Sequence, residues 1–167
     1  MAQVAMRPRL RTWTKGNIFL LAFATLMLAC TPWLAVNFTG SAPRGLWRKT
    51  ALPSVVTRGM WVTMAPPPSM LLWAPWWIPL LKPVAAVAGE RVCVEAETLW
   101  ILGRNYGRVY TQANGQPLPH LQEGCYVVAE GQVFLASQAA KSLDSRYFGP
   151  VAIADLMAEA FPVWTWR

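Results

Sequence analysis

An uncharged stretch from Gly16 to Pro43 constrains this 167-residue chain more than any other feature of its sequence. Inside it, residues 18–36 form a largely apolar run of 19 residues. As a helix this run would be about 28 Å long, close to the roughly 30 Å of a bilayer core. We therefore predict a transmembrane helix over residues 17–37. A cleaved signal peptide is the alternative, but the run is long for one and has no clean small-residue exit motif.

Charge sets the predicted orientation of this helix. Residues 1–89 carry nine basic side chains and no acidic one, whereas residues 90–167 carry six basic and eight acidic side chains. The basic residues ahead of the apolar run favour a cytoplasmic tail over residues 1–16; they are Arg7, Arg9, Arg11 and Lys15. Residues 38–167 are then expected on the periplasmic side of the inner membrane. Because topology accounts for the basic front half, we expect no nucleic-acid partner.

The periplasmic part is predicted to be a mainly β domain. The chain has 14 Pro and 10 Trp, and Pro is excluded from helix interiors, which argues against a helical bundle. Short segments rich in β-branched and aromatic residues alternate with turn signals such as Asn114-Gly115. The predicted strands are residues 60–65, 91–96, 99–102, 108–112, 125–130 and 132–136.

Residues 66–81, with the sequence PPPSMLLWAPWWIPLL, interrupt the strand pattern. The segment is too short and too rich in proline to span a bilayer. One interpretation is a loop that covers the core. The other is a membrane-interface patch, in which Trp73, Trp76 and Trp77 enter the headgroup region of the lipid bilayer.

Few side chains in the sequence suit metal binding or histidine-based catalysis. The one histidine, His120, lies in a polar loop typical of a solvated side chain, and no CxxC or HxxxH spacing indicates a metal site. There is no glycine-rich phosphate loop either, so we expect no metal and no cofactor. Cys93 and Cys125 lie in predicted strands on the oxidising side of the membrane, where a disulfide and two buried free thiols are both open.

Ser41 and Lys82 are the candidate catalytic residues. Ser41 lies five residues after the apolar run, at most about 17 Å of extended chain, and its neighbours are small or turn-forming. A serine nucleophile without histidine needs another base, and lysine is the usual substitute. Lys82 is the one lysine in an apolar setting, where desolvation would lower its pKa by the roughly two to three units that a base needs. The alternative is a lysine that extends to the membrane interface.

Four segments of the chain follow the order of motifs in a known enzyme family. Residues 39–47, TGSAPRGLW, are similar to a nucleophile motif S-x-P-x-G-L-Y/W, and residues 57–62 to the R-G-D-x-V segment that follows it. Residues 82–92 resemble the lysine motif of the family, and residues 142–151 resemble its terminal motif S-x-D-S-R-Y-F/W-G-x-V. The chain thus resembles the membrane-bound Ser-Lys signal peptidases and, within them, the TraF-like peptidases of conjugative transfer. Two positions depart from the usual aspartate, Met60 and Glu90.

The resemblance implies a fold and a set of catalytic roles. The fold would be an antiparallel β domain of the signal peptidase type with one N-terminal transmembrane helix. Ser41 would be the nucleophile and Lys82 the general base. Thr39 and the Ser41 backbone N–H would form the oxyanion hole. Ser142 would orient the Lys82 amine.

The resemblance also implies a supporting ion pair and a substrate. Asp144 and Arg146 would pair and hold the terminal motif against the site, and whether Asp144 acts in catalysis or only braces a turn is open at this point. The substrate would be an exported prepilin-like preprotein, cut at the membrane face in the service of the conjugative transfer machinery. Hydrolysis and cyclisation of the product are both open.

Two other functions compete with this interpretation. A general, housekeeping signal peptidase I would use the same serine and lysine on other preproteins. A non-catalytic, single-pass assembly protein of an export apparatus would explain the apolar run and the β domain, but it would leave the pairing of Ser41 with Lys82 without a purpose.

Overall fold

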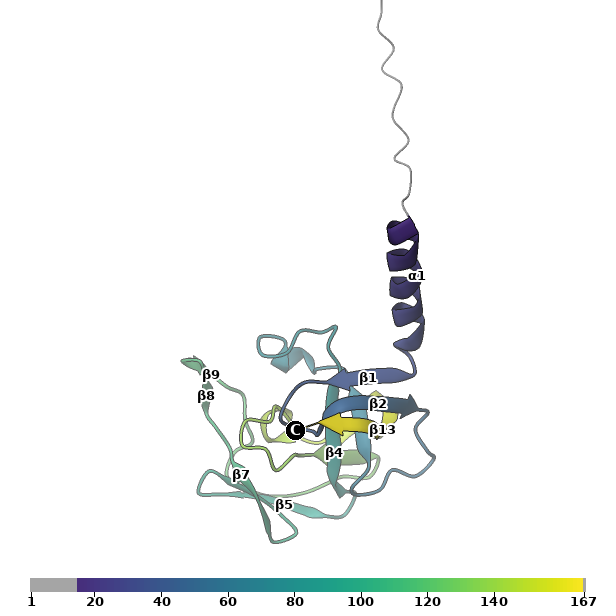
Figure 1. The fold of residues 1–167 in the computed structure, drawn as a ribbon. Helices are drawn as coiled ribbons and strands as arrows, with labels where there is room; N and C mark the ends of the chain where they lie inside the picture. Colours follow the sequence, from purple (N-terminus) through teal and green to yellow (C-terminus); the bar gives the residue numbers. More distant parts are fainter. Residues whose placement is uncertain (1–14, 167) are drawn as a thin grey trace, which may run out of the picture. The chain divides into compact units, whose positions relative to one another are not determined.

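The computed structural model describes residues 15–166, which fall into two compact units that divide after Pro32. The described part of the first unit is helix α1 (Lys15–Cys30). The second unit begins at Trp33 and contains all the strands (Figure 1). The predicted cytoplasmic tail, residues 1–16, lies almost wholly outside the described residues.

Helix α1 is shorter than the helix predicted over residues 17–37. It ends at Cys30, and Leu34–Asn37 form strand β1 instead. The residue before a proline is disfavoured in helical conformation, so Thr31-Pro32 ends the helix inside a run that hydropathy treats as continuous. Across residues 15–166 no helix is both long enough and apolar enough to cross a membrane.

A seven-stranded antiparallel sheet forms the larger part of the β unit. Its strands lie in the order β1, β2 (Arg44–Thr50), β13 (Leu156–Trp166), β3 (Trp61–Met64), β4 (Leu80–Val87), β11 (Gln132–Leu135) and β12 (Val151–Ala152). Figure 1 shows the C-terminal strand β13 beside β2, although more than a hundred residues separate them in sequence.

A four-stranded antiparallel sheet completes the unit, in the order β10 (Gly124–Val127), β5 (Arg91–Glu95), β6 (Thr98–Ile101) and β7 (Arg104–Arg108). A disulfide joins Cys93 to Cys125, which lie directly opposite each other on β5 and β10. The two-stranded hairpin of β8 (Gln112–Ala113) and β9 (Gln116–Pro117) turns at Asn114-Gly115. Both turn residues have positive φ, as a two-residue hairpin turn requires.

Helical structure in the β unit is confined to short turns. The helix α2 (Ser145–Phe148) is preceded by Asp144, whose side chain caps it by accepting from the Arg146 N–H. Two 3₁₀ turns, η1 (Pro68–Met70) and η2 (Ile153–Asp155), complete the set within the described residues.

Strand β4 lies at the junction of the two main apolar clusters. Val84 packs with residues of β3, β11 and β13, whereas Ala85 and Ala86 pack with residues of β5 and β6. Side chains such as Val62 and Val92 are fully buried, and each burial stabilises the fold by about 1.5–3 kcal/mol. The strand that carries Lys82 is therefore held from both faces.

The mainly β prediction is confirmed, and the predicted strands over 60–65, 91–96, 99–102, 125–130 and 132–136 overlap β3, β5, β6, β10 and β11. The strand predicted over 108–112 is wrong, because β7 ends at Arg108. Strands β4 and β13 escaped prediction since they contain Pro83 and Pro162. Proline is tolerated within sheets mainly at bulges and edges, and both prolines lie close to irregularities in strand register.

Candidate active site

The loop between β1 and β2 carries Ser41. Its ends are fixed because Asn37, the last residue of β1, pairs with Gly45 near the start of β2. The Ser41 side chain is half-buried, and its Oγ lies 3.1 Å from the Oγ1 of Thr39. The Trp47 indole N–H, 3.1 Å from the Pro43 carbonyl, adds a second tie between this loop and β2.

Asn37 is a central residue of this loop that the sequence analysis missed. Its side chain is only 8% exposed. Its Nδ2 lies 2.9, 2.9 and 3.1 Å from the carbonyl oxygens of Thr39, Ala42 and Pro43. Its Oδ1 accepts from the N–H and the hydroxyl of Thr39, at 3.2 and 2.8 Å. The available signal was an amide residue at the end of an apolar run, just before the loop that carries Ser41.

Gly45 allows the C-terminal strand to approach this loop. A Cβ added at Gly45 would lie 2.0 Å from the Trp164 carbonyl oxygen, and the φ of Gly45 is +152°. Any other residue at this position would therefore displace β13 from β2. This close approach explains the glycine of the nucleophile motif in physical terms.

Lys82 lies within β4, opposite Val62 of β3, and its side chain is 4% exposed. The Nζ atom donates to Ser41 Oγ at 2.7 Å and to Ser142 Oγ at 3.1 Å. The residues next to the pair, Ala42 and Leu81, belong to one buried apolar cluster. The structure thus brings Ser41, Lys82 and Ser142 into direct contact.

The surroundings of Lys82 favour its neutral form. Burial lowers the pKa of its amine from the ordinary 10.5 to about 8. The negative charge of Asp144 opposes this shift, and the positive charge of Arg146 adds to it. A substantial fraction of the amine is therefore unprotonated in mildly alkaline solution, which is what a general base requires.

Asp144 and Arg146 form a fully buried ion pair. The guanidinium donates to both carboxylate oxygens at 2.8 Å and also to the carbonyls of Tyr106, Ser137 and Ala139. The carboxylate accepts in addition from the N–H groups of Ser137 and Arg146. The pair thereby ties α2 to the loop that carries Ser142.

The contacts of Asp144 are those of a bracing residue. Within residues 15–166 its carboxylate makes no hydrogen bond to Ser41 or Lys82, and it reaches Lys82 only through its charge. Removing one partner of a buried ion pair costs about 3–5 kcal/mol, because the other charge is left uncompensated. The integrity of the terminal motif therefore depends on both residues.

The three tryptophans of residues 66–81 lie in two different environments. Trp76 and Trp77 are 71% and 64% exposed, and their rings meet edge to face. Trp73 instead is half-buried and packs against the cluster of Met70, Leu118 and Tyr147. The segment therefore both covers the core and exposes an aromatic pair.

Three further residues singled out in the sequence, His120, Glu90 and Met60, make their contacts away from Ser41 and Lys82. The Nδ1 of His120 lies 2.8 Å from the Leu118 carbonyl. Glu90 accepts from the Val87 N–H and pairs with Arg58 at 2.8 Å, so it supports the turn before β5 despite the departure from aspartate. Met60 fills the other departing position, where its sulfur accepts from the Thr57 N–H.

Comparison with known proteins gives concordant matches. Residues 11–166 match the family described as signal peptidase, peptidase S26. The conjugal transfer protein TraF of Agrobacterium fabrum C58 is 35% identical over 146 residues, which cover 78% of this chain and 81% of the relative. A plasmid transfer protein TraF of Escherichia coli is 30% identical over 163 residues, which cover 86% of this chain and 91% of the relative.

Among solved structures, a signal peptidase I from Enterococcus faecalis V583 aligns with 66% of this chain and 98% of its own. The sequence identity is 21% and the TM-score is 0.39.

Proposed function

This chain belongs to the signal peptidase family, peptidase S26, and within it to the TraF-like members. We propose that it is a serine endopeptidase and that Ser41 and Lys82 are its catalytic pair. The observation that carries the proposal is the 2.7 Å contact between Lys82 Nζ and Ser41 Oγ. The lowered pKa of the buried amine supports it, because a lysine of ordinary pKa would be protonated and unable to accept a proton.

In the proposed first step, the lone pair of the neutral Lys82 amine accepts the Ser41 proton while Ser41 Oγ attacks the carbonyl carbon of the substrate. The neutral Lys82 amine still donates one N–H to Ser142 Oγ, at 3.1 Å. This hydrogen bond orients the amine so that its nitrogen lone pair faces Ser41. The resulting ammonium then protonates the leaving amine, which leaves an acyl-enzyme on Ser41.

The charge that develops on the substrate oxygen needs donors. The proposed donors are the backbone N–H of Ser41 and the hydroxyl of Thr39, and one such donor contributes roughly 3–4 kcal/mol to transition-state stabilisation. In the resting structure the Thr39 hydroxyl donates to Asn37 Oδ1 and lies 3.1 Å from Ser41 Oγ. Its proton must therefore turn toward the substrate as the oxyanion forms.

The second half of the reaction releases the acyl group. Water attacks the ester carbonyl, Lys82 accepts its proton, and Ser41 Oγ leaves with that proton. If the N-terminal amine of the substrate attacks instead, the product is a ring that is one water lighter than the linear form. Intact mass of the product distinguishes the two routes.

We propose an exported, pilin-like precursor as the substrate, processed for conjugative transfer. The support is that the relatives described above are conjugal and plasmid transfer proteins and are similar over most of their length. This favours a dedicated transfer peptidase over a housekeeping signal peptidase I. The buried Lys82 in contact with Ser41 argues against a non-catalytic assembly protein, which has no use for it.

We also propose that the protein works at the inner membrane, with the β unit on the periplasmic side. The basic residues before an uncharged stretch support this orientation. The apolar side chains of α1 are exposed, as are Trp76 and Trp77. Tryptophan pairs of this kind are typical of membrane interfaces.

Replacing either member of the pair is expected to stop processing. Ser41→Ala and Lys82→Arg should each lower turnover by roughly 10⁴-fold or more, because the first lacks the nucleophile and the second cannot lose its proton. The measurement is the intact mass of the pilin-like precursor from cells that express each variant. Lys49→Arg is the matched control and should process normally. Near-normal turnover by Lys82→Arg would mean that lysine is not the base and would make His120 the next residue to test.

The pH dependence should follow the Lys82 amine. Only the neutral amine accepts a proton, so kcat/KM should rise about tenfold per pH unit below about pH 8 and level off above it. A quenched peptide that contains the precursor cleavage site provides the assay, with circular dichroism at each pH to show that the fold is intact. A flat profile between about pH 6.5 and 9.5 would contradict the assignment of Lys82 as the base.

The exposed tryptophan pair should contact lipid. In vesicles that contain brominated phosphatidylcholine, the tryptophan fluorescence of the full chain should be quenched, and Trp76→Ser/Trp77→Ser should remove part of that quenching. Trp100→Phe, on the four-stranded sheet, is the control and should leave it unchanged. Equal quenching of the double variant and the wild type would show that the pair faces water.

A further inference from the structure

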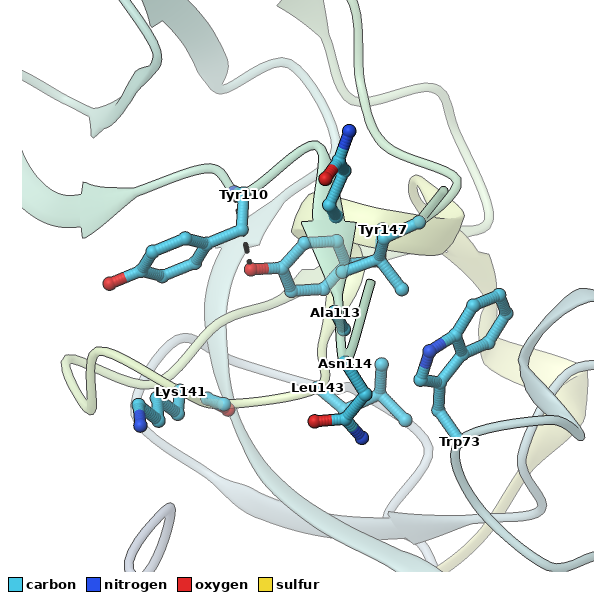
Figure 2. Close-up of a pocket in the computed structure, with 10 residues that line it drawn as sticks. Trp73, Tyr110, Ala113, Asn114, Lys141, Leu143 and Tyr147 are labelled. Atoms are coloured by element: carbon cyan, nitrogen blue, oxygen red, sulfur yellow. Dashed lines mark hydrogen bonds between the residues drawn. The ribbon is translucent and has the colours of Figure 1, made fainter. Parts of the chain in front are cut away.

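A cavity of about 350 Å³ is lined in part by Ser142, which is a hydrogen-bond partner of Lys82. Figure 2 shows the residues around this cavity. Its walls come from three parts of the chain that are distant in sequence. Trp73 belongs to the loop after η1, Asn114 to the turn of the β8–β9 hairpin, and Leu143 to the loop before α2. Figure 2 shows Trp73 and Lys141 at opposite ends of the cavity in this view, with Leu143 and Tyr147 between them.

The cavity is mainly apolar and has one charged group. Trp73, Leu118 and Leu143 contribute apolar side chains, and the Tyr147 ring adds another apolar surface. The Tyr147 hydroxyl accepts from the Tyr110 N–H at 3.5 Å. Lys141 lies exposed at the rim, and no acidic side chain is among the described residues that line the cavity. The lining thus suits an apolar side chain that has a negative charge beside it.

Ser142 connects the cavity to the reacting groups. It lines the cavity, and its Oγ contacts Lys82 Nζ, which in turn contacts Ser41 Oγ. Two hydrogen bonds, of 3.1 and 2.7 Å, therefore link a residue of the cavity wall to the nucleophile. Because an extended chain advances about 3.3–3.6 Å per residue, a polypeptide that acylates Ser41 can reach the cavity with a side chain two or three residues from the cleaved bond.

We propose that this cavity is a specificity pocket for a large apolar side chain of the preprotein, Phe, Leu or Met, next to an acidic residue that faces Lys141. The proposal rests on the proposed function, since it needs a polypeptide to be bound at Ser41. The pocket adds a requirement for sequence near the cleavage site that the catalytic pair alone does not impose.

The test uses the full-length protein in detergent micelles and a library of internally quenched peptides that vary at three positions on each side of the cleaved bond. The wild type should favour Phe, Leu or Met at one position and Asp or Glu beside it. Trp73→Ala should raise KM about tenfold for those peptides and leave kcat within about twofold. For peptides of the same library that have Gly in place of the Phe, Leu or Met, neither constant should change. Lys141→Glu should lower the preference for the acidic neighbour about fivefold, whereas Lys49→Glu should not.

Two outcomes separate this inference from the proposed function. If Ser41→Ala cleaves nothing while Trp73→Ala and Lys141→Glu keep the wild-type preferences, the pocket inference is wrong and the peptidase stands. If Ser41→Ala cleaves normally, or the wild type cleaves no member of the library, the proposed function fails and the pocket inference fails with it. Thermal unfolding of each variant shows whether it is folded. If Trp73→Ala does not fold, Lys141→Glu still tests the inference, because Lys141 is exposed.

The hydrogen bonds of Asn37 support a second, independent inference. A hydroxyl has one proton, and the Thr39 hydroxyl gives it to Asn37 Oδ1. Thr39 Oγ1 can therefore only accept from Ser41, so in the resting state the Ser41 hydroxyl donates its proton to Thr39 Oγ1. The Ser41 oxygen in turn accepts from the protonated amine of Lys82. We infer that Asn37 is a positioning residue, which sets both the shape of the loop over 39–43 and the direction of the Thr39 hydroxyl.

Asn37→Ala is expected to lower kcat about 10- to 100-fold and leave KM within about twofold, because a displacement near 1 Å at the nucleophile is enough for such a loss. Asn105→Ala, at an exposed position on β7, is the matched control. If Asn37→Ala does not fold, Asn37→Asp keeps the shape and the acceptor but lacks the Nδ2 donor, and kcat should fall as well. If a folded Asn37 variant keeps the wild-type kcat, or changes in KM alone, the inference is wrong. In that case an inactive Ser41→Ala shows that the proposed function still holds.

Discussion

The burial of one amine is the constraint on which the rest of the site depends. Lys82 is 4% exposed, and burial lowers its pKa from 10.5 to about 8. Between about pH 8 and pH 10.5 the Lys82 amine is protonated in the unfolded chain and largely neutral in the folded one. The contribution of this group to the free energy of unfolding therefore rises with pH in that range. Below about pH 8 the buried ammonium costs the fold roughly 3 kcal/mol. The protein tolerates a less stable β4 in return for an amine that can act as a base.

The cost of burying Lys82 is moderated by its neighbours. Asp144 opposes the effect of burial, since its negative charge raises the pKa of the amine. Arg146 takes up both oxygens of that carboxylate and acts in the opposite direction. The ion pair thus keeps the carboxylate from becoming the direct partner of Lys82. It leaves Ser41 and Ser142 as the hydrogen-bond partners of the amine.

The sequence allowed Lys82 to be predicted because the alternatives are few: one histidine, and one lysine among apolar neighbours. Ser41 was predicted from its position just after the apolar run and from the resemblance of residues 39–47 to the nucleophile motif of the family. It did not predict Asn37, whose importance appears only when the loop closes and brings three carbonyl oxygens to one amide. The end of α1 at Cys30 was missed because hydropathy does not register the conformational effect of Pro32. Strands β4 and β13 were missed for a related reason, since Pro83 and Pro162 read as breaks where the sheet accommodates them.

The order of strands in the larger sheet determines when Ser41 and Lys82 can meet during folding. The β1–β2 hairpin, which holds Ser41, connects through the sheet to β4 only by way of β13 and β3. Strand β13 comes from residues 156–166, and Gly45 admits it closely against β2. Contacts between residues so far apart in sequence slow the folding of a sheet, because the entropy of closing a long loop opposes them. A chain that still lacks residues 156–166 therefore lacks the strand that joins the hairpin of Ser41 to β3 and β4.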